Sequence, residues 1–258
     1  MLLAIDCGNT HITMGIYNED RFVRHWRLTS DGEKTEDEYI ILLNTLLEIE
    51  GLKVSDIDAI AIASVVPEIT RCWQVLARSY LGTEALVIDN ELKLSMPILM
   101  DNPQEMGADR IVDALAAYTK YGGDSPLIVV DFGTATTFDC ISQKGEYLGG
   151  AITPGIEISQ EALFQRAALL SRVPIVPPQN IIGKNTAECL QIGFFIGYAS
   201  QVDGVVEHLK QELGSNTRVI ATGGLAGMIF EYSKTIESYD VLLALDGLKL
   251  AYDKFKKR

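Results

Sequence analysis

Two Asp-x-Gly motifs carry the strongest chemical signal in this sequence. The first is Asp6-Cys7-Gly8-Asn9-Thr10, and the second is Asp131-Phe132-Gly133-Thr134, which continues into further threonines. The glycine of such a motif lets backbone N–H groups approach phosphate oxygens, and the carboxylate can hold a hydrated Mg²⁺ ion. One such motif is weak evidence, because many turns of this kind only close a hairpin. Two of them at matching positions favour a phosphate-binding function.

A third motif, Gly107-Ala108-Asp109-Arg110, comes directly before a helical pattern of apolar residues. Asp109 therefore lies at the start of a predicted helix, where a carboxylate can cap the first turn and interact favourably with the helix dipole. The alternative is that Asp109 is a general base and that Arg110 binds an anion beside it. The residues alone leave both interpretations open.

Three glycine segments each have a functional and a structural interpretation. Residues 219–226 predict a strand, the turn Thr222-Gly223-Gly224 and a helix, which fits contact with a nucleotide base or ribose, or a tight strand-to-helix connection. Gly149–Gly155 is expected to be a Gly/Pro loop, either a plain turn or a loop that closes on a substrate. Gly183–Thr186 looks like a truncated phosphate loop. However, GxxxxGK[ST] and GxGxxG are both absent, which argues against Walker ATPases and Rossmann dehydrogenases.

Apolar runs and helical periodicity place these motifs on alternating strands and helices. Strands are predicted for residues 2–5, 12–17, 22–28 and 57–66. Helices are predicted for residues 35–50, 68–80 and 109–121. Alternation of this kind predicts an α/β fold.

The two Asp-x-Gly motifs belong to an internal repeat. Leu3–Gly8 and Ile128–Gly133 both read as a strand that ends in Asp-x-Gly, and Asp6 matches Asp131 at an offset of 125 residues. The sequence therefore predicts a duplicated domain, with an edge hairpin in each half and a cleft between the halves. The halves are expected at residues 1–121 and 122–258. The alternative is a chance likeness between two unrelated turns.

Composition limits the classes of partner. The 258 residues include 22 Lys and Arg against 35 Asp and Glu, which gives a formal net charge of −13. Sequence-independent binding to nucleic acid or to an anionic membrane is therefore not expected. No apolar run approaches the ~20 residues that a membrane-spanning helix needs, and the N-terminus lacks the basic region of a signal peptide. Four separated cysteines without CxxC spacing fit a reduced, cytoplasmic protein.

Taken together, the motifs resemble the type III pantothenate kinases, which belong to the superfamily of acetate kinase, sugar kinases, Hsp70 and actin. The matching stretches occur in the order of the family and span almost the whole chain: Asp6–Thr10, Asn102-Pro103 leading into Gly107–Arg110, Asp131–Thr137, Gly149–Gly155, Gly183–Thr186 and Thr222–Gly224. Each motif is unspecific by itself, whereas the ordered set is specific.

The resemblance implies a fold and an activity. The fold would be α/β, with two ribonuclease-H-like, actin-like halves and a nucleotide cleft between them. The activity would be transfer of the ATP γ-phosphoryl group to the 4′-hydroxyl of pantothenate, the first step of coenzyme A biosynthesis. Mg²⁺–ATP and a monovalent cation, K⁺ or NH₄⁺, would be required. The active site would be completed across a homodimer.

The resemblance also implies roles for individual residues. The first phosphate loop would contact ATP through Asp6, Cys7, Gly8, Asn9, Thr10, His11, Ile12 and Thr13, with Asp6 near Mg²⁺. Thr134 would contact ATP, and Asp131 would bind the monovalent cation. Asp109 would accept the proton of the hydroxyl group, and pantothenate would be bound by Met100, Gly107, Ala108, Asp109, Arg110 and Thr186. The family usually has Tyr where Met100 stands, and methionine donates no hydrogen bond.

Two other functions remain open from the sequence. The chain could be another small-molecule kinase of the same superfamily, although the Gly107–Arg110 stretch argues against a sugar or acid substrate. It could also be a non-catalytic regulator related to accessory transcription factors. The presence of Asp6, Asp109 and Asp131 argues for catalysis.

Overall fold

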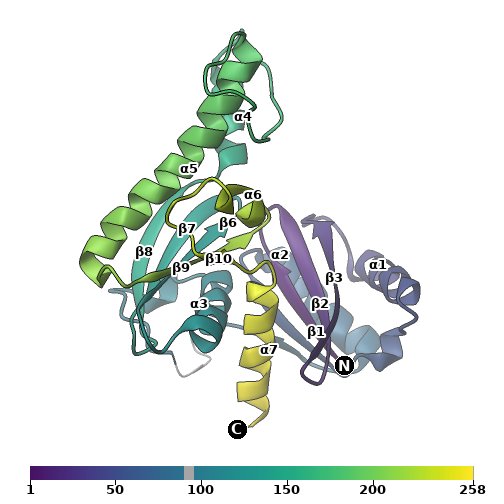
Figure 1. Ribbon diagram of the computed structural model, residues 1–258. Coiled ribbons are helices and arrows are strands. Elements are labelled where there is room, and N and C mark those ends of the chain that lie inside the picture. Colours follow the sequence, from purple (N-terminus) through teal and green to yellow (C-terminus); the bar gives the residue numbers. More distant parts are fainter. Residues whose placement is uncertain (90–95, 258) are drawn as a thin grey trace. The chain divides into compact units, whose positions relative to one another are not determined.

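The computed structural model describes residues 1–89 and 96–257 of the chain (Figure 1). The polypeptide forms two compact units. The first consists of Met1–Met96, Asp101–Ala116 and Leu242–Arg258, and the second consists of Pro97–Met100 and Ala117–Val241. The expected domain division at residues 121 and 122 stays a prediction.

A five-stranded sheet forms the centre of the first unit. Its order is β3-β2-β1-β4-β5, with β1 at Leu2–Cys7, β2 at His11–Asn18, β3 at Arg21–Thr29, β4 at Ala59–Ser64 and β5 at Ala85–Val87. β1 pairs antiparallel with β2 and parallel with β4. The four predicted strands are confirmed, and their ends differ from the prediction by at most two residues.

Helices α1 (Glu36–Ile49) and α2 (Pro67–Leu76) pack against one face of this sheet. Tyr39 of α1 and Trp73 of α2 are fully buried there, in one apolar cluster with alternate residues of β1 such as Ile5. α1 begins at a capping box in which Thr35 and Glu38 satisfy each other's backbone N–H groups. α2 continues into a π-helical turn at Ala77–Leu81, so the predicted helix over 68–80 is confirmed as two segments.

Helices α3 (Ala108–Tyr121) and α7 (Leu243–Lys256) complete the elements around the first sheet. α7 packs against β1, β2 and β4. A Cβ at Gly247 of α7 would lie 2.1 Å from the carbonyl oxygen of Val112, so only glycine allows these two helices to approach so closely. The Tyr17 hydroxyl donates a hydrogen bond of 2.6 Å to Asp246 and ties α7 to β2.

The second unit repeats the topology of the first sheet. Its order is β10-β9-β6-β7-β8, with β6 at Leu127–Phe132, β7 at Ala135–Ile141, β8 at Tyr147–Pro154, β9 at Arg218–Gly223 and β10 at Ser238–Tyr239. β6 is antiparallel to β7 and parallel to β9, as β1 is to β2 and β4. The predicted duplication and the α/β class are therefore confirmed.

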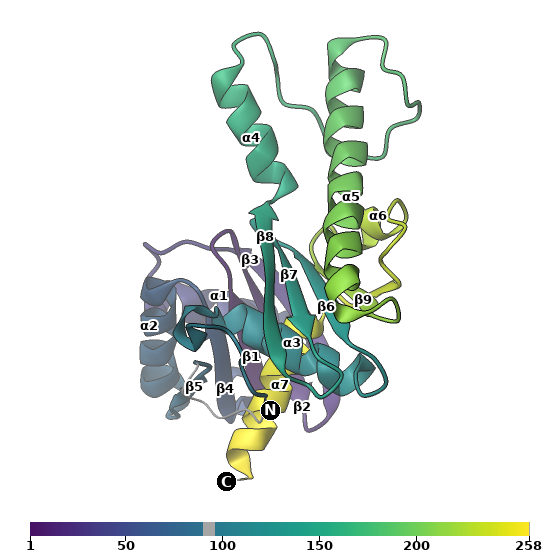
Figure 2. The same cartoon turned by 90° about the vertical axis from the view of Figure 1, so that its left-hand side faces the viewer.

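The long helix α5 (Thr186–Leu213) covers one face of the second sheet. Its residues Phe195, Val202 and Val206 share a buried cluster with β6 and β9. α4 (Ile156–Arg166) and the first part of α5 extend beyond the end of the sheet (Figure 2). We call α4, the connection at residues 167–185 and this part of α5 the helical arm.

The segment Gly149–Gly155 is not a loop, so that prediction is wrong. β8 runs through Pro154 and pairs antiparallel with β7, and Gly155 follows as the residue before α4. A Cβ at Gly150 would lie 1.7 Å from the carbonyl oxygen of Phe138. Gly150 therefore serves close contact between strands, while Gly149, with φ of 112°, lies where the register of β7 and β8 shifts.

Several smaller features complete the description. Short 3₁₀ helices occupy Val54–Asp56 and Pro103–Glu105, and α6 is Ala226–Phe230. All four cysteines are free thiols. Within the described residues, none of the helices has the length and apolar character to cross a membrane.

Candidate active site

The first Asp-x-Gly motif forms the turn between β1 and β2. The Gly8 N–H donates to the carbonyl oxygen of His11 over 2.9 Å and closes the turn. Asn9 and Thr10 at the tip are exposed, while Asp6 lies half-buried between Thr13 of β2 and Ala63 of β4. The turn therefore offers exposed backbone and polar groups close to a half-buried carboxylate.

Cys7 and Ile12 face the opposite way from Asp6. Both are buried in the apolar cluster of the first unit. Burial raises the pKa of the Cys7 thiol, and the nearby charge of Asp6 raises it further. Cys7 therefore stays a neutral thiol, and of these two residues only the backbone is available to a ligand at the turn.

The Gly107–Arg110 motif lies at the same edge of the first sheet. The Val65 N–H donates to the carbonyl oxygen of Cys7 over 3.1 Å, and a Cβ at Gly107 would lie 3.7 Å from a Val65 methyl group. Val65 therefore links the end of β1 to the start of α3. The structure brings these two sequence motifs together within one unit.

Asp109 occupies the first turn of α3 and not the capping position. The Ile111 N–H donates to the carbonyl oxygen of Gly107 over 3.2 Å, so the residue that precedes the helix is Gly107. Asp109 is half-buried, and its Oδ1 accepts a hydrogen bond of 2.8 Å from the Arg110 N–H. The prediction that Asp109 could be the cap is therefore wrong in position, although the carboxylate does bind a backbone N–H of the first turn.

The second Asp-x-Gly motif repeats the first in the other unit. Its turn is closed by a 3.1 Å hydrogen bond from the Gly133 N–H to the carbonyl oxygen of Ala135. Asp131 lies opposite Thr137 of β7 and Thr222 of β9. Asp131 is half-buried, as Asp6 is, so the two carboxylates hold equivalent places in the two sheets.

The turn Thr222-Gly223-Gly224 lies against Asp131. Gly223 has φ of 88°, and a Cβ there would lie 2.4 Å from Oδ1 of Asp131 and 2.7 Å from the Phe132 nitrogen. Both the positive φ and the lack of space require glycine. Sequence reasoning missed this contact, because parallel pairing of β6 with β9 brings together residues far apart in the chain. Two strands that each end at a glycine motif are the only sequence signal for it.

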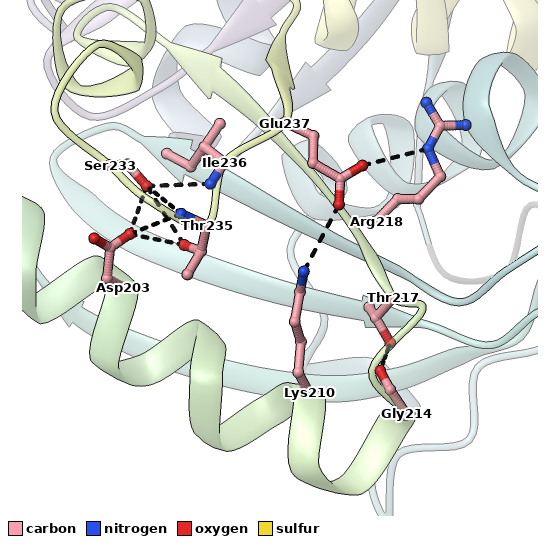
Figure 3. Close-up of polar contacts among 9 residues, drawn as sticks. All are labelled: Asp203, Lys210, Gly214, Thr217, Arg218, Ser233, Thr235, Ile236 and Glu237. Atoms are coloured by element: carbon pink, nitrogen blue, oxygen red, sulfur yellow. Dashed lines mark hydrogen bonds and ion pairs between the residues drawn. The ribbon is translucent and has the colours of Figure 1, made fainter.

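A carboxylate from α5 anchors the segment that follows α6 (Figure 3). Asp203 accepts hydrogen bonds from the Ser233 hydroxyl over 2.6 Å, the Lys234 N–H over 3.0 Å and the Thr235 hydroxyl over 2.8 Å. Burial alone would raise the pKa of Asp203, but these hydrogen bonds outweigh it and lower the pKa overall. The connection between α6 and β10 is thus held to α5.

The threonines after Asp131 have three different environments. Thr134 is exposed at the turn, and its carbonyl oxygen accepts from the Gly155 N–H over 3.1 Å. Thr136 is fully buried and hydrogen-bonds the Tyr198 hydroxyl of α5. The Thr137 hydroxyl donates to the carboxylate of Asp139 over 3.0 Å. Only Thr134 is presented to solvent at the tip.

The two remaining predicted substrate contacts lie elsewhere in the second unit. Met100 is half-buried at the end of a short stretch in which the Leu99 N–H donates to the carbonyl oxygen of Tyr147 over 2.8 Å. Thr186 is exposed at the first position of α5. The preceding Asn185 caps this helix by accepting from the Glu188 N–H over 3.0 Å. Gly183–Thr186 is therefore a capped helix start and not a phosphate loop.

The oxygen groups at the two hairpins suit hard cations. In the part of the chain that the structure describes, no three His, Cys, Asp or Glu side chains gather to hold a metal ion. Mg²⁺ in kinases is commonly held by one or two carboxylates together with water and phosphate oxygens, which a single carboxylate such as Asp6 can serve. At Asp131, Thr137 and Thr222 lie opposite the carboxylate on the two neighbouring strands and add hydroxyl oxygens. The donor set fits the cations expected there.

Comparison with known proteins places this fold in a class. The ROK hexokinase from Thermus thermophilus aligns with 98% of this chain and 99% of its own, with a TM-score of 0.52 and 14% identity. At this identity the likeness shows the fold alone. The two α/β units of one topology, each with an Asp-x-Gly hairpin, therefore have the fold class of sugar kinases and actin-like proteins.

Sequence similarity is more specific. The family model for type III pantothenate kinases matches residues 2–208. The type III pantothenate kinase of Geotalea uraniireducens (strain Rf4) is 51% identical over 98% of both chains. That of Moorella thermoacetica (strain ATCC 39073 / JCM 9320) is 49% identical over 98% of this chain and 99% of its own. The chain belongs to the type III pantothenate kinase family.

Proposed function

We propose that this protein transfers the γ-phosphoryl group of ATP to the 4′-hydroxyl of pantothenate, the first step of coenzyme A biosynthesis. The observation that carries the proposal is similarity at about half of all positions over nearly the full chain to type III pantothenate kinases. The structure supports it with Asp6 and Asp109 at one edge of a single sheet and Asp131 at the matching place of the other. Phosphoryl transfer depends mainly on positioning and charge stabilisation, for which such rigid elements are suited.

In this proposal, the β1–β2 turn binds the phosphates of Mg²⁺–ATP. The exposed Asn9 and Thr10 and the backbone of the turn offer hydrogen-bond donors to phosphate oxygens. Asp6 is proposed to hold Mg²⁺, which supplies positive charge that stabilises the phosphates when it is bound. The segment Asp6–Thr13 and Thr134 make up the proposed ATP contacts.

Asp109 is the proposed proton acceptor for the pantothenate hydroxyl. The half-buried carboxylate is held in a fixed direction by its hydrogen bond from the Arg110 N–H, 2.8 Å long. A base held in place can take the proton as the hydroxyl oxygen attacks the phosphorus. Arg110 offers a planar pair of donors that suits the carboxylate of pantothenate or a phosphate.

The remaining proposed pantothenate contacts are Gly107, Ala108, Met100 and Thr186. A side chain at position 107 would clash with Asp109, because its Cβ would lie 2.4 Å from Oδ1. Gly107 therefore leaves room for the base to adopt its position. Met100 can pack against the aliphatic part of pantothenate but cannot donate a hydrogen bond to it.

Asp131 is the proposed ligand of a monovalent cation, K⁺ or NH₄⁺. Such a cation, when bound, supplies a positive charge that offsets the repulsion between the carboxylate and a triphosphate. The proposal is supported by the hydroxyl-bearing residues Thr137 and Thr222, which lie opposite Asp131 on both neighbouring strands.

We also propose that the protein is a homodimer. The helical arm carries exposed apolar side chains, among them Leu169 at 97%, Ile182 at 79% and Ile181 at 67% exposure. Clusters of large exposed apolar residues are typical of protein–protein contact surfaces. The proposed second copy would cover these side chains, and the active site would be completed in the dimer.

A coupled assay of ADP release with and without pantothenate tests the function. The proposal expects ADP release that depends on pantothenate. Release that depends instead on a sugar or a carboxylic acid would support another kinase of the same superfamily. The absence of turnover with all acceptors, in a protein that is folded, would support the regulator alternative.

A further inference from the structure

A buried carboxylate lies beside the Asp131 hairpin, and the proposed mechanism does not use it. Asp139 of β7 is 0% exposed. Its Oδ1 accepts a hydrogen bond of 2.5 Å from the Tyr147 hydroxyl, and its Oδ2 accepts one of 3.0 Å from the Thr137 hydroxyl. Burial of a carboxylate is costly unless its oxygens are hydrogen-bonded, and here each oxygen has a hydroxyl donor.

The register of the strands places Thr137 between Asp139 and Asp131. Residues two apart on a strand share one face of the sheet, so Thr137 and Asp139 point to the same side of β7. Thr137 lies directly opposite Asp131 of β6. Side chains of directly opposite residues share a face, with Cβ atoms about 4.5–5.5 Å apart. All three side chains therefore lie on one face of the second sheet.

The hydrogen bond to Asp139 determines the direction in which the Thr137 hydroxyl donates its proton. A hydroxyl has one proton to donate and two lone pairs to offer. Thr137 gives its proton to Asp139, so its oxygen can offer only lone pairs to the side of Asp131. An oxygen with its lone pairs beside a carboxylate suits a hard cation, whereas a hydroxyl that donated to Asp131 would compete with the cation.

We propose that Asp139 is a positioning residue, which makes the Thr137 hydroxyl a second oxygen ligand of the monovalent cation at Asp131. This inference rests on the cation site of the proposed function and deepens it. It assigns to Thr137 the direct contact and to Asp139 the control of the direction of the Thr137 proton. The Tyr147 hydroxyl donates to the other oxygen of Asp139 and helps to hold the carboxylate in place.

The test measures cation binding by thermal unfolding, without turnover. The full-length protein is held with Mg²⁺ and a non-hydrolysable ATP analogue, while KCl replaces tetramethylammonium chloride at constant ionic strength. The K⁺ concentration at half of the rise in Tm reports the affinity for K⁺. The variants are Thr137→Val, Thr137→Ser and Asp139→Leu. Thr217→Val is the matched control, because it removes a hydroxyl that likewise donates to a protein oxygen, the Gly214 carbonyl, just before β9 and at the other end of that strand from Thr222.

Loss of one cation ligand is expected to raise the K⁺ midpoint about tenfold in Thr137→Val, which corresponds to ~1.4 kcal/mol. Thr137→Ser keeps the hydroxyl, so its K⁺ midpoint should stay within about threefold of that of the parent protein. The K⁺ midpoint of Thr217→Val should stay within the same range. Asp139→Leu removes both acceptor oxygens at similar volume, so the Thr137 proton is no longer held and the K⁺ midpoint should rise. The Tm in tetramethylammonium chloride alone shows how far each variant is destabilised for other reasons.

A parent-like K⁺ midpoint in Thr137→Val or in a folded Asp139→Leu overturns the inference, even when the variant has a lower Tm in both salts. If Asp139→Leu does not fold, the contrast between Thr137→Val and Thr137→Ser still decides. Asp131→Ala distinguishes failure of the cation site itself from failure of the roles given to Thr137 and Asp139. If the K⁺ effect on Tm is lost in Asp131→Ala but unchanged in Thr137→Val, the cation site at Asp131 is supported. The assignment of Thr137 and Asp139 is then overturned. The absence of any K⁺-specific effect in the parent protein overturns both.

Discussion

Asp109 has one chemical task in the proposed mechanism that an amide cannot perform. Asn can still accept the hydrogen bond that the Arg110 N–H donates over 2.8 Å, but it cannot take a proton. Asp109→Asn should therefore leave the fold intact and lower kcat by about 10²–10⁴-fold. The coupled ADP-release assay measures the rate, and circular dichroism checks the fold. Near-normal turnover would show that Asp109 only stabilises the start of α3.

Met100 differs from the residue that the family usually has at its position. Met100→Tyr should retain activity and lower the KM for pantothenate, because a tyrosine hydroxyl can donate a hydrogen bond that methionine lacks. Initial rates over a range of pantothenate concentrations give KM and kcat separately. A KM that rises severalfold would mean that the pocket is shaped around methionine.

Asp131 should make turnover depend on a monovalent cation. Na⁺ is smaller than K⁺ and holds its water more tightly, so we expect K⁺ and NH₄⁺ to activate and Na⁺ to substitute poorly. The measurement is turnover at saturating Mg²⁺–ATP and pantothenate, with KCl replaced by NaCl or by a tetraalkylammonium salt at constant ionic strength. Activation by K⁺ in the parent protein and not in Asp131→Ala would support the site. Equal rates in all three salts would rule it out.

At the scale of elements, Asp203 holds the connection after α6 to α5. The hydrogen bonds that lower the pKa of Asp203 stabilise the folded state while the carboxylate is ionised. This stabilisation is present above the pKa of an unfolded aspartate, about 3.9, and is lost as the pH falls through the lower pKa of the folded state. Asp203→Asn should lower the free energy of unfolding at pH 7 by about 1.5–3 kcal/mol, the range for hydrogen bonds to charged groups.

Urea unfolding at pH 7 and at pH 3 measures this effect. The difference between the parent protein and Asp203→Asn should be larger at pH 7 than at pH 3, because protonation weakens the parent's contacts at low pH. Asp58 offers a contrast, since it is exposed and its ion pair with the N-terminal ammonium lies at the surface. Asp58→Asn should change stability less than Asp203→Asn does, because solvent screens an exposed ion pair. Equal losses in the two variants at pH 7 would contradict the role of Asp203.

The elements that could be predicted from the sequence are those with local signals. The hairpins at Gly8 and Gly133 have short strands and a glycine turn, and α1 has a capping residue at Thr35 and a stop at Gly51, whose φ is 72°. Local signals fail where long-range pairing decides. β8 contains Gly150 because a neighbouring strand comes close and Gly149 because its φ is 112°, and a glycine-rich stretch gives the same local signal as a loop.

The same limit applies to the candidate site. The Asp-x-Gly carboxylates and Asp109 could be identified because their motifs are local. The contact of Gly223 with Asp131 depends on the parallel register of β6 with β9, and the bond between Asp139 and Tyr147 depends on side chains of two different strands. Neither leaves a periodicity or a spacing that the sequence alone would show.

At the scale of the whole molecule, one topology occurs twice with different chemistry at equivalent places. Asp6 and Asp131 both lie at the end of a central strand, but Asp6 has Ala63 on its parallel neighbour where Asp131 has Thr222. The second hairpin therefore has more hydroxyl oxygens around its carboxylate. This difference fits the separate proposals of Mg²⁺ at the first hairpin and a monovalent cation at the second.

The proposed dimer gives a prediction at this scale. Ile182 lies on the helical arm and is 79% exposed. If a second copy covers it, Ile182→Glu would place a charge in an apolar interface, which is costly without a partner. Light scattering coupled to size-exclusion chromatography should then show a shift from dimer to monomer. Ile49→Glu is the matched control, because Ile49 is 71% exposed at the end of α1 and outside the arm.

Activity should follow the oligomeric state, because the proposed active site is completed by the second subunit. Specific activity of Ile182→Glu should fall on dilution, as the remaining dimer dissociates by mass action. Ile49→Glu should keep both the dimer and the parent rate over the same range of concentration. A monomeric Ile182→Glu protein with full specific activity would separate catalysis from assembly and contradict the shared site. A dimeric and fully active Ile182→Glu protein would show that the second copy does not cover Ile182.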